Sequence, residues 1–172
     1  MPCSRRTTTL AAVAAAALAE GYAVGLVEQP YRVAGRRGPA PAHQLDAAWV
    51  AVVERLCARE LRGLPLVPGG RSSGARVACR TAAATDACGV LCLAFPLQPV
   101  RRSGPPAASR LPELDAVRVP VLVVQGRRDP FGVPPAARGR TVIEVEGTHS
   151  LRASAAAVGE AAATWLAGLL GP

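Results

Sequence analysis

Apolar residues form two kinds of pattern along this chain, and segments of the two kinds alternate. Where apolar side chains recur every three or four residues, the spacing predicts an amphipathic helix. Such segments are residues 42–61, 74–84 and 153–170. Short continuous apolar runs instead predict buried strands. These runs lie at residues 24–27, 64–67, 89–95, 119–125 and 141–145.

Because strands and helices alternate with short links, the chain predicts an α/β fold. We expect a three-layer sandwich, in which about five strands form a mostly parallel sheet with helices on both faces. Residues 31–41 and the Pro-, Arg- and Ser-rich stretch 97–116 are predicted loops. A length of 172 residues fits a single domain over residues 1–172, with residues 1–9 atypical or disordered.

The start of the chain allows two interpretations. Residues 4–19 pair two arginines with an Ala-rich apolar stretch, as a twin-arginine secretory signal does. The same residues can form an ordinary helix capped by Thr7, Thr8 or Thr9. The helix is favoured, because cleavage near Ala19 would leave a mature protein that begins on a predicted core strand. We therefore expect a cytoplasmic protein, or an exported one if residues 1–19 act as a signal.

Composition narrows the possible partners. All 20 basic residues are Arg, and the formal net charge is +8. The arginines are scattered and no aromatic residues interleave with them, so we expect a solvated basic surface and no nucleic-acid partner. No apolar run reaches the roughly 18 residues of a membrane span, so no membrane partner is expected.

Five cysteines without a CxxC pair argue against a zinc site and a disulfide framework, and favour a reducing compartment. No cofactor or metal motif is present, and the sequence does not indicate an oligomeric state.

Three reactive side chains follow three of the predicted strands. Ser72 lies in Gly-Arg-Ser-Ser-Gly, a G-x-S-x-G sequence between a strand and a helix. Asp129 follows the strand 119–125, and His149 follows the strand 141–145. Ligands of parallel sheets bind at the carboxyl ends of the strands, where all three residues are expected.

Each of these residues alone has an ordinary explanation as part of a turn or a surface loop. Together they follow the chain order Ser, Asp, His of the nucleophile-elbow enzymes. A serine hydroxyl needs a base to take its proton, and a carboxylate can orient the imidazole that serves as this base. The backbone N–H of Ser73, at the start of the next helix, is the expected first donor to an oxyanion.

With these motifs, the sequence resembles the α/β-hydrolase superfamily, and most closely its small, capless, dienelactone-hydrolase-like branch. The resemblance runs from about residue 10 to the C-terminus. It rests on residues 69–75, 93–97, 119–131 and 147–150, together with residues 27–32. It implies Ser72 as nucleophile, His149 as general base and Asp129 as the acid that orients the histidine.

The sequence departs from this family pattern in two places. Family members carry a His-Gly or Gly-rich loop, after their third strand, that completes the oxyanion hole, and no such loop is found here. Three front strands and one of two oxyanion donors are therefore expected to be absent, as in a truncated product or a chain with a misplaced start. Pro68 precedes the nucleophile turn and cannot donate to a sheet ladder. Either the strand ends at Val67 or the turn is distorted.

The leading expectation is a serine hydrolase that cleaves an ester or thioester of a small acyl substrate. The alternatives are a catalytically inactive hydrolase-like binding or scaffold protein, or a truncated fragment. The substrate itself cannot be read from the sequence. Arg101, Arg102 or Arg110 in the loop 97–116 could attract an anionic substrate, although solvated surface is the favoured interpretation.

Overall fold

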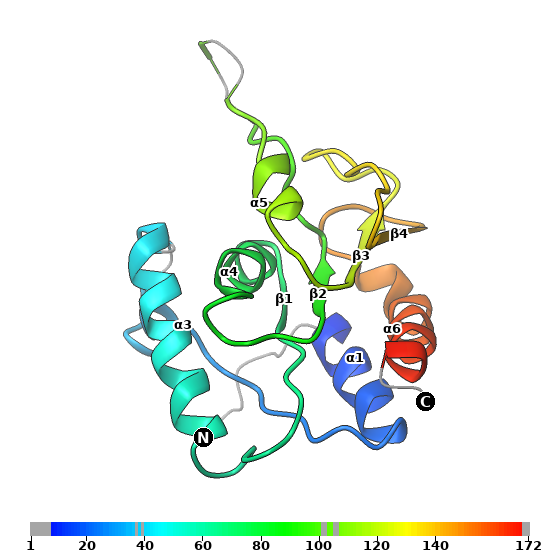
Figure 1. Ribbon diagram of the computed structural model, residues 1–172. Helices are drawn as coiled ribbons and strands as arrows, with labels where there is room; N and C mark the ends of the chain where they lie inside the picture. The colour runs from blue at the N-terminus through cyan, green and yellow to red at the C-terminus, as the bar shows by residue number, and fades with distance from the viewer. Residues whose placement is uncertain (1–7, 37, 39, 101–102, 105–106, 170–172) are drawn as a thin grey trace.

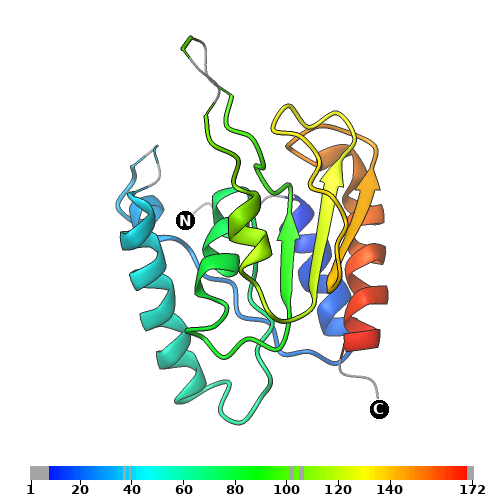
Figure 2. The same cartoon turned by 45° about the horizontal axis from the view of Figure 1, so that its top comes forward.

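A parallel sheet lies at the centre of the computed structural model, which describes residues 8–36, 38, 40–100, 103–104 and 107–169 (Figure 1). Its four strands lie side by side in chain order, and every neighbouring pair is parallel. The green, yellow and orange arrows of Figure 2 are the last three of them and run in the same direction. They are β1 (Gly69–Arg71), β2 (Val90–Leu93), β3 (Val121–Gly126) and β4 (Arg140–Val145). The predicted α/β class and the parallel sheet are thus confirmed, with one strand fewer than expected.

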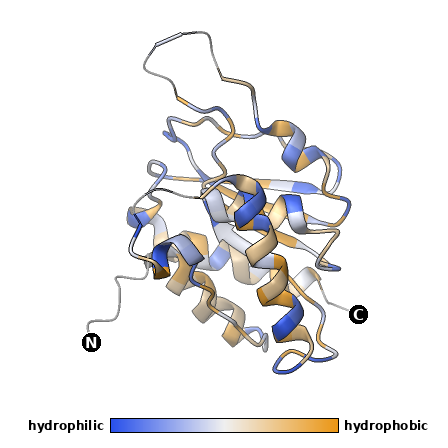
Figure 3. Cartoon of the chain, turned by 90° about the vertical axis from the view of Figure 1, so that its left-hand side faces the viewer, coloured by the Kyte–Doolittle hydropathy of each residue, from blue (hydrophilic) through white to orange (hydrophobic). Residues whose placement is uncertain are grey.

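Helices cover both faces of the sheet, as predicted. On one face lie α4 (Ser73–Thr81) and the short α5 (Leu111–Asp115), and α3 (Ala42–Cys57) packs outside α4. Figure 3 views the molecule from the α3 side, and its helices carry both hydrophobic and hydrophilic positions. On the other face, α1 (Thr8–Ala19) packs against α6 (Ala155–Leu169).

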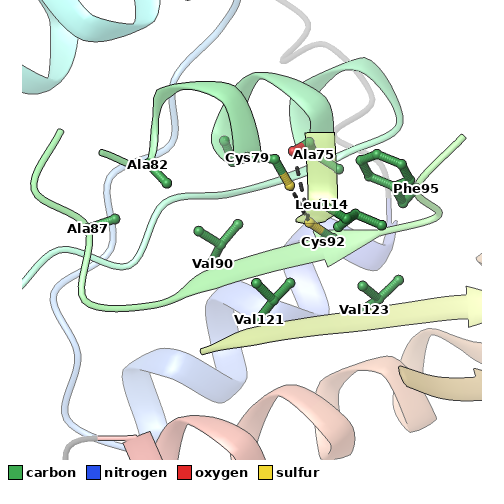
Figure 4. Packing of buried hydrophobic residues seen from close by; sticks show 11 residues of the cluster. Ala75, Cys79, Ala82, Ala87, Val90, Cys92, Phe95, Leu114, Val121 and Val123 are labelled. Carbon is green, nitrogen blue, oxygen red and sulfur yellow. Dashed lines mark hydrogen bonds between the residues drawn. The ribbon is translucent and has the colours of Figure 1, made fainter. Parts of the chain in front are cut away.

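Alternating side chains of the central strands form two separate cores. Val90 and Cys92 of β2 face α4, in the cluster drawn in Figure 4. Leu91 and Leu93 of the same strand face α1 and α6. A strand that is buried on both faces has no polar side to show, and this is why its sequence is a continuous apolar run.

The predicted strand at residues 24–27 is wrong. Residues 23–29 form neither a strand nor a helix, and Val24 and Leu26 are exposed. An apolar cavity of about 570 Å³ lies here, lined both by residues 20–27 and by residues 64–70 of the segment leading into β1. The backbone of a strand must pair with a neighbouring strand, and within the described residues the segment 24–27 pairs with none.

The predicted strand at residues 64–67 is displaced along the chain. Within it, Leu66 makes only an isolated bridge with Ala87, and the paired strand begins after Pro68. The Pro68 carbonyl accepts a hydrogen bond from the Leu91 N–H at 3.0 Å. Pro68 itself has no N–H to return, so the regular ladder starts at Gly69. The proline therefore precedes the strand, which is neither of the two outcomes expected.

Most predicted helices form with altered ends. The first begins at Thr8 and includes Thr9, so part of the predicted atypical segment 1–9 is helical, and residues 1–7 lie outside the described residues. The predicted helices at 42–61, 74–84 and 153–170 are shortened to α3, α4 and α6, and a 3-10 turn over Arg152–Ser154 precedes α6. Both predicted loops contain short helices, which are α2 (Pro30–Val33) and α5.

Candidate active site

Ser72 occupies a sharp turn between β1 and α4. Its φ of 56° and ψ of −115° lie outside the regions that L-residues favour. The backbone N–H of Ser72 donates to the Leu93 carbonyl of β2 at 2.9 Å, which ties the turn to the sheet. Two residues earlier, Gly70 lies so close to α4 that a Cβ atom would meet Gly74 backbone atoms at 2.5 and 2.7 Å. The G-x-S-x-G sequence thus permits a close strand-to-helix approach that leaves the serine partly exposed at the turn.

Asp129 follows β3 and is held by donors from its own loop and strand. Its Oδ1 accepts a hydrogen bond from the Phe131 N–H at 2.9 Å. Its Oδ2 accepts one from Nε2 of Gln125, also at 2.9 Å. The carboxylate side chain is fully buried. These hydrogen bonds compensate the burial of a charge that would be costly without partners.

His149 follows β4 on a loop that packs directly on the loop after β3. A Cβ atom at Gly126 would meet the carbonyl oxygens of Thr148 and Gly147 at 2.7 and 2.8 Å, so only glycine permits this approach. The Phe131 ring lies beside the imidazole, with ring centroids 4.5 Å apart. The histidine is therefore located by the same loop that carries Asp129.

The three predicted residues meet in one hydrogen-bonded line. Nε2 of His149 lies 2.9 Å from Oγ of Ser72, and Nδ1 lies 2.8 Å from Oδ2 of Asp129. The His149 side chain is 21% exposed, whereas that of Asp129 is 0% exposed, so the line runs from the interior toward solvent. A serine, an imidazole and a buried carboxylate at these distances can relay a proton from the hydroxyl to the imidazole.

An N–H group that could face an oxyanion lies next to the serine. Ser73 is the first residue of α4, and N–H groups in the first turn of a helix have no intrahelical partner. The helix dipole also places positive charge at this end. The role expected for Ser73 in the sequence is compatible with this position.

Gln125 belongs to the site although the sequence did not single it out. Besides Asp129, its side chain binds Phe95 twice, through Oε1 to the N–H at 2.8 Å and through Nε2 to the carbonyl at 3.0 Å. It is fully buried at the end of an otherwise apolar strand. A polar side chain in a run of Val and Leu was the signal that could have identified it.

Arg71 was also missed, although it lies inside the nucleophile motif. Its Nη1 donates to the His149 carbonyl at 3.0 Å. Burial lowers the pKa of the Arg71 guanidinium, and the positive charges of Arg152 and Arg32 lower it further, against the opposing effect of Asp129. The site therefore contains more positive charge than its three reactive residues suggest.

Of the three arginines named in the loop 97–116, the structure describes only Arg110. Arg110 donates to the Pro96 carbonyl at 3.1 Å, and Arg101 and Arg102 lie outside the described residues. Among the described residues, no group of three or more His, Cys, Asp or Glu side chains could hold a metal ion. None of the helices among the described residues is long and apolar enough to cross a membrane.

Solved structures with the same fold come from two bacteria. An alpha/beta superfamily protein from Xanthomonas campestris has a TM-score of 0.64 and 18% identity, over 94% of this chain and 90% of that one. An alpha-beta serine hydrolase homologue from Coxiella burnetii has a TM-score of 0.63 and 14% identity, over 98% and 78% of the two chains. An alpha/beta serine hydrolase without a lid, again from Xanthomonas campestris, has a TM-score of 0.61 and 20% identity, over 94% and 75%.

Two sequence comparisons give different results. No curated protein matches the chain significantly. A family model for the alpha/beta hydrolase domain, however, matches residues 4–155, which include the strand-to-helix turn at Ser72 and the loops that carry Asp129 and His149. With this match over most of its length and with the fold described above, the chain belongs to the alpha/beta hydrolase domain family.

Proposed function

We propose that the protein is a serine hydrolase that cleaves an ester or thioester of a small acyl substrate. The observation that carries this proposal is the position of His149, whose two ring nitrogens lie within hydrogen-bond distance of Ser72 and Asp129. Two of the structural neighbours are described as serine hydrolases or their homologues, and this supports the same chemistry.

In the first half of the reaction, Oγ of Ser72 attacks the carbonyl carbon while Nε2 of His149 takes the hydroxyl proton. The carbonyl oxygen of the tetrahedral intermediate faces the backbone N–H of Ser73. When the intermediate collapses, the bond to the leaving alcohol or thiol breaks, and the imidazolium gives its proton to that leaving group. An acyl-serine remains.

In the second half, water attacks the acyl carbon as His149 takes one of its protons. The Ser72–acyl bond then breaks, the serine regains a proton from the imidazolium, and the carboxylic acid leaves. Asp129 keeps the imidazole oriented and stabilises its positive charge in both halves. Gln125 and the Phe131 N–H hold Asp129 in place and act through it.

Labelling with a fluorophosphonate probe tests the proposal, because the probe reacts with an activated serine. The wild-type protein should be labelled at Ser72, and Ser72→Ala should not be labelled. Ser73→Ala is the matched control, since it removes a neighbouring hydroxyl but keeps the backbone N–H, and it should still be labelled. Folded wild-type protein that neither labels nor hydrolyses a p-nitrophenyl ester would refute the enzyme and favour a binding or scaffold role.

A further inference from the structure

One side chain of β1 reaches the loop that carries His149. Nη1 of Arg71 donates a hydrogen bond to the main-chain carbonyl of His149 at 3.0 Å. Arg71 is the last residue of β1 and directly precedes Ser72, whereas His149 follows β4. In the described sheet β1 and β4 are the two outermost strands, three strand spacings or roughly 14 Å apart. The loop after β4 must therefore reach back across the end of the sheet to meet the serine, and Arg71 binds it there.

The Arg71 side chain starts from a fixed backbone. In the parallel ladder Arg71 is paired with Leu93 of β2, and the next N–H along the chain, that of Ser72, donates to the Leu93 carbonyl at 2.9 Å. One short stretch of backbone thus presents the guanidinium and the proposed nucleophile on consecutive residues. Because the two groups share this support, the hydrogen bond from Arg71 ties the His149 backbone to the position of Ser72.

The residues on either side of His149 give its backbone little support. Thr148 and Ser150 are both exposed, so their side chains are not held by packing in the interior. Leu151 is fully buried and anchors the chain only after this exposed stretch. Exposed loop segments open at low free energy. The hydrogen bond from Arg71 therefore acts at the point of the loop where a fixed position matters most.

Three atoms of His149 are held by three different partners. Oγ of Ser72 and Oδ2 of Asp129 lie at hydrogen-bond distance from the two ring nitrogens, and Nη1 of Arg71 from the main-chain oxygen. The two ring contacts orient the imidazole, whereas the third fixes the backbone from which the ring extends. Position matters for a general base, since a displacement of about 1 Å can cost about a hundredfold in rate.

Arg71 also differs from an ordinary surface arginine in its burial. A surface arginine keeps its charged head in water. Arg71 is partly buried, and burial lowers the pKa of its guanidinium because the charged form loses water. A hydrogen bond from a charged donor is stronger than one between neutral groups and compensates part of this loss. The contact with the His149 carbonyl is thus a specific feature of this side chain.

We propose that Arg71 is a positioning residue for the reaction, which holds the His149 backbone so that Nε2 lies at the distance needed to take the Ser72 proton. This inference rests on the proposed hydrolase function and deepens it. In this role Arg71 acts through His149.

Two substitutions separate the hydrogen bond from the bulk of the side chain. Arg71→Met keeps most of the apolar stem and loses every donor, whereas Arg71→Lys keeps a charged donor. With a p-nitrophenyl ester, Arg71→Met should lower kcat about tenfold to a hundredfold and change KM less than about twofold, because the base is misplaced while substrate binding is unaffected. Arg71→Lys should retain most of the wild-type kcat.

Arg76→Met is the matched control, because it removes the same charge from a nearby, partly buried position. Arg76 lies on α4, and its Nε donates to the Glu113 carboxylate of α5 at 2.8 Å. Loss of this ion pair should lower the free energy of unfolding and leave the kcat of the folded protein unchanged. An equal loss of kcat in Arg76→Met and Arg71→Met would show a general effect of removing an arginine near the nucleophile, and would overturn the positioning role.

Proton NMR tests the same contact without catalysis. The chain contains two histidines, so the ring N–H signals are few and His43→Gln assigns them. The hydrogen bond from Nδ1 of His149 to Asp129 should give a low-field proton signal in the wild-type protein. This signal should persist in Arg71→Lys and Arg76→Met, and should be lost through exchange with water in Arg71→Met.

The outcomes separate this inference from the proposed function. Wild-type protein that does not label with fluorophosphonate overturns the hydrolase, and the NMR comparison then still tests whether Arg71 holds His149. Protein that labels, but whose kcat and low-field signal both survive Arg71→Met, overturns the positioning role and leaves the hydrolase intact. If Arg71→Met does not fold, Arg71→Gln takes its place with the same expected loss, because its shorter side chain does not reach the same carbonyl.

Discussion

Nε2 of Gln125 lies 2.9 Å from Oδ2 of Asp129, the same oxygen that contacts Nδ1 of His149. The same amide also forms hydrogen bonds with the backbone N–H and carbonyl of Phe95, two residues after the neighbouring strand β2. The buried Gln125 side chain therefore links the Asp129 carboxylate to the sheet. Through this carboxylate it also affects the orientation of His149.

Replacing this amide should cost stability and activity together. Gln125→Leu leaves the Phe95 N–H without its partner in the interior, although the Phe95 carbonyl keeps its hydrogen bond from the Leu97 N–H, and this should lower the free energy of unfolding by about 1–3 kcal/mol. Urea denaturation measures this change, and esterase assays should show a lower kcat with a smaller change in KM. Val124→Leu, on the same buried strand, controls for packing alone and should keep kcat.

Gln125→Glu should make the free energy of unfolding depend more strongly on pH. The introduced carboxyl would lie beside Asp129, and repulsion between like charges raises the pKa of such a group in the folded state. A group with a raised pKa binds more protons when folded, so the free energy of unfolding should fall as pH rises. Relative to wild type, the variant should be least stable near pH 8 and recover toward pH 5. A pH-independent difference would contradict this coupling.

The backbone at Ser72 should release strain when the side chain is removed entirely. A positive φ in a non-glycine residue costs on the order of 1–3 kcal/mol, and glycine adopts such angles freely. Ser72→Gly should therefore be more stable than Ser72→Ala by about 1 kcal/mol, although both lack the hydroxyl. Thermal or urea unfolding of the two inactive variants makes the comparison, and equal stabilities would show that the turn is unstrained.

Gly70 and Gly74 should respond to alanine in opposite ways. A Cβ atom at Gly70 would meet backbone atoms that cannot move without displacing α4, so Gly70→Ala should destabilise the fold by at least about 1–3 kcal/mol and abolish labelling at Ser72. A Cβ atom at Gly74 meets nothing within 4 Å. Gly74→Ala lies in a helix and should leave stability unchanged or raise it by up to about 1 kcal/mol. Equal losses in the two variants would contradict the close approach.

The described cysteines should differ in reactivity according to their burial. Cys79 and Cys92 are buried with their sulfur atoms 3.4 Å apart (Figure 4), and the hydrogen bond that the Cys92 thiol shares with Cys79, together with burial, raises the pKa of Cys92. Thiolates are the reactive form, so this pair should not react with a disulfide reagent at pH 8 in folded protein. Cys57 and Cys88 are partly exposed and should react, Cys88 more slowly because burial raises its pKa. Mass spectrometry locates the modified residues.

The sequence was most informative where one physical requirement decided the structure. The apolar runs of β2 and β3 were predictable because burial on both faces leaves no room for polar side chains. The order of Ser72, Asp129 and His149 at strand ends was predictable because parallel strands bring their carboxyl ends to one edge. What links these residues to the sheet, above all Gln125, depends on distances between side chains that a sequence does not contain.

The errors have a common physical cause. Residues 24–27 have the composition of a strand, but a strand forms only where a neighbour can accept its hydrogen bonds, and composition says nothing of neighbours. The same limit hid the hydrogen bond from Arg71 to the His149 carbonyl, because the two residues are 78 positions apart in the sequence and only the folded chain brings them together.

In the described sheet, the three proposed catalytic residues follow strands that differ in their number of paired neighbours. Asp129 follows β3, which has a neighbour on each side, whereas Ser72 and His149 follow β1 and β4, the two outermost strands. Strands paired on one side alone open at lower free energy than those inside a sheet. Mild heat or denaturant should therefore inactivate the protein before circular dichroism detects unfolding. The temperature and denaturant range in which the proposed activity survives would then be set by local opening of the outer strands and not by global unfolding.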